Sequence, residues 1–211
     1  MILIIGAMAS ETSQIEQLIQ NQNWLSIAGK PIVLGTINDQ KVMLATTGVG
    51  KVNASMVLSA ILSKYPIDWI INVGLVGGFM PLVQGEMVIV NQAIYHDFDL
   101  TIFGYEKGQV PQMPVYYQTD VKLLNKLSSL LNVKHVKLYT GDSFTTSLIE
   151  ENACCDMEGA AFYQVAYLFE KPIISVKVIS DVIGKPSQIE AYEAFEQSCS
   201  QRFKTLIGLV L

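Results

Sequence analysis

Charge, cysteine and long apolar runs are all scarce in this sequence. Only 16% of its 211 residues are charged, and the net charge is −5 with a pI near 5.0. An acidic chain repels a phosphate backbone, so we expect no nucleic-acid partner. No uninterrupted apolar run reaches the about 18 residues that a membrane span needs, so we expect no membrane-spanning segment.

The residue types that hold metals and disulfides are also few. The three cysteines are Cys154, Cys155 and Cys199, a spacing that provides neither a disulfide framework nor a zinc site. The two histidines, His96 and His135, have no companions at metal-ligand spacing, so ordinary hydrogen bonding explains them better. We therefore expect a reduced, cytoplasmic setting with no metal and no cofactor.

Hydrophobic residues, in contrast, make up 50% of the chain. At this length the composition predicts one large α/β core, so we expect a single domain over residues 1–211. Low charge together with high hydrophobic content indicates apolar surface covered by a partner, and we expect a homodimer. The apolar opening, residues 1–9, is interpreted as a strand rather than a signal peptide, because its apolar core is short and no basic residue precedes Lys30.

Hydrophobic periodicity predicts strands alternating with helices. The expected strands are residues 2–5, 32–37, 42–45, 69–73, 87–94, 136–139 and 173–181. The expected helices are residues 10–20, 119–131 and 157–169, one that follows Lys51 and carries Val57, Leu58, Ile61 and Leu62, and a last one from about residue 187.

The most informative stretch is residues 156–181, in which a helix leads into a strand. Its periodicity predicts a helix with Asp156 as N-cap and Glu158 in the first turn. Pro172 ends the helix, and the apolar run after it predicts a central strand of a parallel sheet with Asp181 at its C-terminal end. Ligands bind at that edge of open α/β sheets, so two carboxylates are expected there. Carboxylates also serve as caps and turn residues, which leaves a purely structural role open.

Other candidate features follow the ends of predicted strands. Glu11 lies just past the first strand, as a site residue or as a solvated glutamate favoured by the helix dipole. The glycine-rich residues 46–51 lack Walker A spacing, so tight backbone packing explains them better than phosphate binding. Residues 74–78 contain three glycines, which either let a flat ligand approach the backbone or form a plain loop.

Ordered matches to a known family extend over nearly the whole chain. They are residues 5–8 with Glu11, 48–52, 72–74 with 77–78, 95–97, 103–105, 141–142 with Phe144, 157–158 and 180–181. On these matches the sequence resembles the nucleoside phosphorylase superfamily and, within it, the 5′-methylthioadenosine/S-adenosylhomocysteine nucleosidases. The resemblance implies an α/β fold with a mixed central β-sheet flanked by helices, and hydrolysis of an adenine N-glycosidic bond.

The resemblance also implies roles for individual side chains. Asp181 would be the general acid that protonates adenine N7, Glu11 would activate the attacking water, and Glu158 would bind the ribose hydroxyls. The other implied substrate contacts are Met8, Val76, Gly77, Phe144, Thr145, Met157 and Ser180. Phe103 and Pro111 would come from the neighbouring subunit of a homodimer and cover the 5′-substituent.

Four departures from the family pattern leave alternatives open. Leu75 replaces a serine, Lys177 replaces an arginine, residues 183–184 are Ile-Gly instead of Ala-Asp, and the segment between Phe144 and Met157 is short. Phosphorolytic relatives use that serine hydroxyl on phosphate, so its loss favours water as the nucleophile. The alternatives are a phosphorylase, a nucleosidase for another 5′-substituted adenosine, and a catalytically weakened nucleoside-binding protein.

Overall fold

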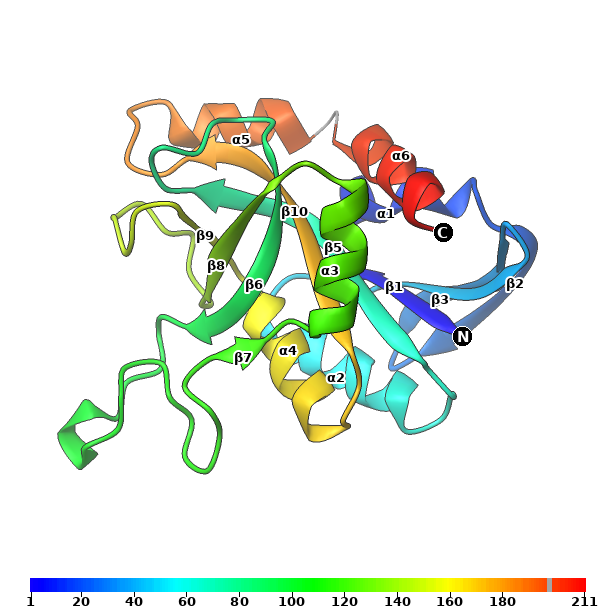
Figure 1. The fold of residues 1–211 in the computed structure, drawn as a ribbon, viewed down its shortest axis with the longest axis horizontal. Helices are drawn as coiled ribbons and strands as arrows, with labels where there is room; N and C mark the ends of the chain where they lie inside the picture. The colour runs from blue at the N-terminus through cyan, green and yellow to red at the C-terminus, as the bar shows by residue number, and fades with distance from the viewer. Residues whose placement is uncertain (197–198) are drawn as a thin grey trace.

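A computed structural model describes residues 1–196 and 199–211 (Figure 1). The strands are β1 (Ile2–Gly6), β2 (Gln20–Ile27), β3 (Lys30–Ile37), β4 (Gln40–Thr46), β5 (Trp69–Gly78), β6 (Met87–Tyr95), β7 (Tyr117–Gln118), β8 (Lys134–Thr140), β9 (Ala153–Asp156) and β10 (Ile173–Val182). The helices are α1 (Ala9–Glu16), α2 (Lys51–Leu62), α3 (Val121–Leu130), α4 (Gly159–Leu168), α5 (Gln188–Glu196) and α6 (Ser200–Val210), with a 3₁₀ turn η1 (Thr101–Phe103).

All of these strands belong to one ten-stranded sheet, which is mixed as predicted. The antiparallel strands β2, β3 and β4 form one end, and β1 lies between β4 and β5 with both neighbours parallel to it. At the other end β5, β10, β6, β8 and β9 pair in turn, and β9 pairs back to β5. The sheet therefore closes into a ring of five strands beside the open part.

Helices cover both faces of the sheet, as predicted. Helices α2 and α4 lie side by side beneath it in Figure 1, and their apolar residues join one large core cluster. Helices α1, α3 and α6 contribute to a second cluster on the other face. Because β1, β5 and β10 lie between the two cores, nearly every side chain on these strands is buried, which explains their continuous apolar sequence.

The predicted helix over residues 10–20 is too long. Helix α1 ends at Glu16, and Gln20 begins β2, an unpredicted strand that pairs antiparallel with β3. Strand β2 is almost entirely exposed, so it lacks the apolar alternation that marks a half-buried strand. The short strands β7 and β9 were not predicted either. Apart from the end of β5, the other predicted strands and helices before residue 171 agree within two residues at each end.

The prediction that β5 ends at residue 73 is wrong, because the strand continues to Gly78. Its glycines make room for acidic side chains instead of forming a loop. A Cβ atom on Gly74 would lie 2.9 Å from Glu11 Oε1, and one on Gly77 would lie 3.2 Å from Asp181 Oδ2. Close approach of carboxylates thus explains why glycines occur inside a buried strand.

The N-cap prediction is also wrong in position. Asp156 is the last residue of β9, and the N-cap of α4 is Glu158, which therefore precedes the first turn. The Asp156 carboxylate still caps the helix, because its Oδ1 accepts a hydrogen bond of 3.0 Å from Gly159 N.

Two predictions near the C-terminal end of the chain need correction. Strand β10 is parallel to β5 but antiparallel to β6, so its surroundings are mixed, and Asp181 is its penultimate residue. The last helix predicted from about residue 187 corresponds to two helices, α5 and α6. The part of that prediction at residues 197–198 lies outside the described residues.

Candidate active site

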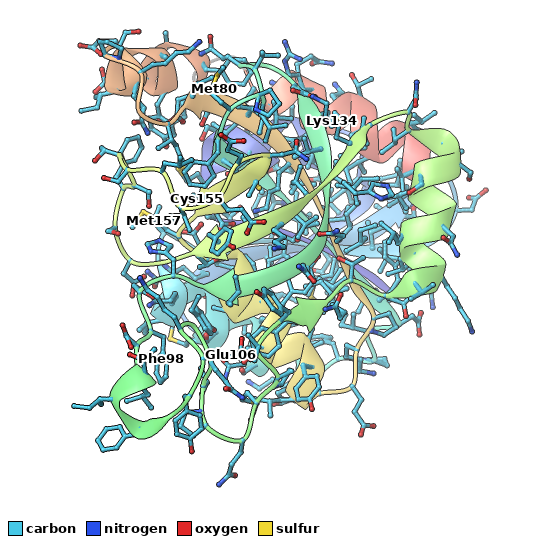
Figure 2. The ribbon with its side chains drawn as sticks, turned by 60° about the vertical axis from the view of Figure 1, so that its left-hand side comes forward. Met80, Phe98, Glu106, Lys134, Cys155 and Met157 are labelled. Atoms are coloured by element: carbon cyan, nitrogen blue, oxygen red, sulfur yellow. The ribbon has the colours of Figure 1, made fainter. Side chains whose placement is uncertain are left out.

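One cavity collects most of the predicted site residues. It has about 580 Å³ of empty volume, part of it open to solvent, and it lies where β1, β5, β9 and β10 end. Cys155 and Met157, two of its residues, lie together at one side of the molecule in Figure 2. The predicted residues in its lining are Met8, Glu11, Val76, Gly77, Phe144, Thr145, Met157, Glu158, Ser180 and Asp181.

Phe103 and Pro111 do not line this cavity. Both belong to the segment between β6 and β7, which projects from the sheet in Figure 1 and carries Phe98 and Glu106 in Figure 2. Phe103 is 74% exposed on η1, and Pro111 is half-buried. The chain's own copies of these residues thus lie outside its own cavity, and their supply by a neighbouring subunit stays a prediction.

Glu11 is held by backbone N–H groups from the residues after β1 and from within β5. Its Oε2 accepts hydrogen bonds from Ala7 N at 2.7 Å and Met8 N at 3.0 Å, and its Oε1 accepts one from Leu75 N at 2.8 Å. Burial raises the pKa of this carboxyl, although Lys177 and the three N–H groups oppose that shift. Glu11 is therefore a fixed carboxylate with increased basicity, as a general base requires.

Glu158 faces the same cavity from the start of α4. Its Oε1 accepts a hydrogen bond of 2.7 Å from Gly50 N, which belongs to the turn before α2. Burial, reinforced by the negative charge of Asp156, raises its pKa to about 7. Glu158 therefore gains and loses a proton near neutrality.

An ion-pair network fixes the turn that reaches Glu158. Lys51 Nζ lies 2.6 Å from Asp97 Oδ2, and that oxygen also accepts a hydrogen bond of 2.9 Å from Asp142 N. Lys51 N in turn donates to Asp142 Oδ1 at 3.0 Å. The start of α2 is thus tied to the loops after β6 and β8.

Asp181 is buried on β10 and its two oxygens have different partners. Ser180 Oγ lies 2.5 Å from Oδ1 and 3.1 Å from the Val76 carbonyl, and Gln188 Nε2 donates to Oδ2 at 2.8 Å. A hydroxyl has one hydrogen, so when Ser180 donates to Val76 the proton between Ser180 Oγ and Oδ1 must belong to Asp181. Burial also raises the pKa of Asp181, with the two hydrogen bonds opposing. The site therefore favours a carboxyl group that keeps its proton.

A buried ion pair lies behind these carboxylates. Lys177 Nζ is 3.0 Å from Asp156 Oδ2, and both residues are less than one-tenth exposed. Burial opposes the charge on Lys177, but Asp156 together with Glu11 and Glu158 outweighs it and raises the pKa of the ammonium group. Lys177 therefore places a positive charge among three acidic side chains, whereas the sequence analysis noted it only as the replacement of an arginine.

Sequence reasoning missed the contribution of α5 to the cavity. Gln188 and Tyr192 of this helix both line it. Tyr192 packs edge-on against Phe144, with ring centroids 5.6 Å apart, and its hydroxyl contacts Met8 Sδ. The signal that could have found them is their four-residue spacing on a helix that follows Asp181 within a few residues.

The four family departures lie in or near the same cavity. Leu75 lines it with an apolar side chain and donates its N–H to Glu11, and Ile183 lines it beside Gly77.

Across residues 1–196 and 199–211, no three His, Cys, Asp or Glu side chains are grouped so that they could hold a metal ion. Within the same residues, no helix has the length and apolarity to cross a bilayer.

The pKa of Glu158 predicts a pH-dependent stability. Between its ordinary value of 4.5 and about 7, folded Glu158 keeps a proton that the unfolded chain releases, so the free energy of unfolding falls as pH rises through about 7. Glu158→Gln removes this effect and keeps an acceptor for Gly50 N. Urea unfolding at pH 5 and pH 8 should show the wild type losing on the order of 1–3 kcal/mol relative to the variant. An unchanged difference between the two proteins would contradict the prediction.

Comparison with known proteins gives matches over the full chain. A family model described as the phosphorylase superfamily matches residues 1–211. The 5′-methylthioadenosine/S-adenosylhomocysteine nucleosidase of a Geobacillus species is 35% identical over 228 aligned residues, covering 100% of this chain and 96% of the relative.

Solved structures of nucleosidases bearing the same name are similar as well. That of Neisseria meningitidis, in complex with methylthio-immucillin-A, has a TM-score of 0.93 at 25% identity and covers 99% of this chain and 97% of its own. That of Colwellia psychrerythraea, in complex with adenine, has a TM-score of 0.93 at 26% identity and covers 99% and 93%.

Proposed function

Because the chain belongs to the phosphorylase superfamily and, within it, to the 5′-methylthioadenosine/S-adenosylhomocysteine nucleosidases, we propose that it hydrolyses the N-glycosidic bond of 5′-methylthioadenosine. The products are adenine and the thioribose, and S-adenosylhomocysteine is a second substrate. The observation that supports this reaction best is the convergence of three buried carboxyl groups, from α1, the start of α4 and β10, on one cavity.

The leaving group takes its proton from Asp181. Adenine departs with developing negative charge, and protonation at N7 neutralises it. Burial of Asp181 and its short contact with Ser180 favour the protonated carboxyl that this step consumes. Phe144 stacks on the base, and the Thr145 backbone reads its edge.

The attacking water is activated by Glu11. As the ribose becomes oxocarbenium-like, the water loses a proton to this carboxylate, whose raised pKa increases its basicity. Glu158 binds the ribose hydroxyls, and Met157 packs on the ribose. The negative carboxylates also stabilise the positive charge that develops on the sugar.

The same proposal includes a homodimer in which the partner completes the site. Its support is an apolar rim that the chain leaves open, since Val49 and Phe144 line the cavity and each is 46% exposed. In this assembly Phe103 and Pro111 of one subunit cover the 5′-substituent bound by the other.

We further infer one domain over residues 1–211 and a cytoplasmic location, the latter because the three cysteines are free thiols.

A phosphorylase is the competing function, and the residues present disfavour it. Leu75 has no hydroxyl for phosphate, and the only arginine of the chain, Arg202, lies on α6 outside the cavity. We expect adenine release from methylthioadenosine in phosphate-free buffer, followed by its absorbance, at a rate that added phosphate does not raise. Release that requires phosphate, with a sugar 1-phosphate as product, would establish phosphorolysis instead.

The substrate itself is tested by a panel of methylthioadenosine, S-adenosylhomocysteine, adenosine and inosine. We expect kcat/KM to be highest for the two thioether nucleosides. A preference for another 5′-substituted adenosine would replace the proposed substrate but keep the reaction type.

A further inference from the structure

The carboxamide of Gln188 lies between the Asp181 carboxyl group and the Thr145 backbone, the two groups that the proposed function places in contact with adenine. Its Nε2 donates to Asp181 Oδ2 at 2.8 Å and to the Thr145 carbonyl at 2.9 Å. Its Oε1 accepts a hydrogen bond of 3.2 Å from Gly184 N. These partners fix the orientation of the amide, because a carboxylate and a carbonyl accept only from the NH₂ end and an N–H donates only to the oxygen end. Gln188 is 6% exposed and lines the cavity.

An amide NH₂ and the exocyclic amine of adenine present the same pattern. Each is a planar nitrogen with two N–H donors about 120° apart, and here both donors are used on the acid and on the loop that reads the base. The amine of adenine lies on the same edge of the purine as N7. A carboxyl group that protonates N7 through one oxygen can therefore accept from the amine through the other.

The two oxygens of Asp181 have partners that match these two roles. Oδ1 shares a proton with Ser180, and Oδ2 accepts from an NH₂ group. In this structure that NH₂ group is the Gln188 amide. We propose that Gln188 stands in for the exocyclic amine of adenine and must withdraw when a 6-aminopurine binds, so that it competes with substrate for Thr145 and Asp181.

This inference rests on the proposed function and adds a specificity residue to it. Gln188 lowers the affinity for adenine by the strength of two hydrogen bonds that must be broken first. A purine without the 6-amino group leaves both acceptors free, so Gln188 need not move for it. The residue therefore reduces the discrimination between adenine and unsubstituted purine.

The test replaces Gln188 by methionine, which has a similar shape and no donors. Calorimetric titration should show adenine binding roughly three- to tenfold tighter to Gln188→Met than to the wild type, and unsubstituted purine binding equally well to both. The kcat/KM for methylthioadenosine should rise by a similar factor through a lower KM. Gln188→Ala, which removes the whole carboxamide and leaves space in its place, should change adenine binding in the same direction.

Gln84 offers a matched control. Its Nε2 also joins β10 to α5, donating to the Ser180 carbonyl at 2.8 Å and the Ala191 carbonyl at 3.0 Å, but it lies outside the cavity. Gln84→Met should leave adenine affinity unchanged. An equal gain in that variant would assign the effect to a loosened α5 and overturn the proposal.

The remaining outcomes are decisive as well. Adenine binding that is unchanged or weaker in both Gln188 variants overturns the inference and leaves the proposed function intact. A lower kcat with a shifted pH profile and unchanged KM would show that Gln188 positions Asp181 instead, which also overturns it. A wild-type protein that does not bind adenine would contradict the inference and the proposed function together.

Discussion

Asp181→Asn is expected to lower the turnover of methylthioadenosine by at least a factor of about 10²–10⁴ while leaving nucleoside binding nearly intact. Asparagine keeps the size of the side chain and an acceptor for Gln188, but it has no proton to give to N7. The measurement is adenine release at substrate saturation, combined with a binding titration of an uncleaved analogue.

Asp39→Asn is a suitable control for that experiment. Asp39 is exposed in the β3–β4 turn with a positive φ, a conformation that asparagine also adopts. Its turnover should equal that of the wild type. Wild-type activity in Asp181→Asn would remove Asp181 from the mechanism and leave the purine without an acid.

Glu11→Gln should lower turnover by about 10²–10⁴ as well, for a different reason. The variant cannot accept a proton from water. In addition, both carboxylate oxygens of Glu11 accept backbone N–H groups, so the NH₂ end of glutamine must face at least one N–H donor. That conflict adds a stability cost of roughly 1–3 kcal/mol.

Activity and stability must therefore be measured together for this variant. Thermal unfolding shows how much of the protein is folded at the assay temperature, and turnover is corrected for that fraction. Glu16→Gln, on the same helix but outside the cavity, should change neither quantity. Folded Glu11→Gln with an undiminished rate would point to another base.

The sequence predicted the parts of the fold in which burial imposes a simple pattern. Strands β1 and β10 are buried on both faces, and their apolar runs were read correctly. Strand β2 was missed because it is exposed and lacks apolar alternation, although the two-residue turn at residues 28–29 makes its pairing with β3 a local hairpin. The end of β5 was misplaced because glycines ordinarily mark loops, while here they accommodate side chains from α1 and β10.

The candidate site shows the same division. Periodicity placed Glu158 and Asp181 at one edge of the sheet, the resemblance supplied their roles, and both line one cavity. Gln188 and the Asp156–Lys177 pair were not predicted, because their importance arises from contacts between β9, β10, α5 and the segment before β9 that no local pattern encodes. Packing of distant segments decides those contacts, and only coordinates show them.

The pairing of β10 with β5 contains one extra residue on β10. Ile179 is opposite Val76 and Asp181 is opposite Gly77, so Ser180 is a bulge without a partner. Side chains on a regular strand alternate between faces, yet Ser180 and Asp181 are neighbours in sequence and both line the cavity, so the bulge places the hydroxyl and the acid on the same side. One extra backbone unit thus gives the acid its hydroxyl partner: deleting Ser180 would keep Asp181 opposite Gly77 but remove the group that shares the proton of its Oδ1.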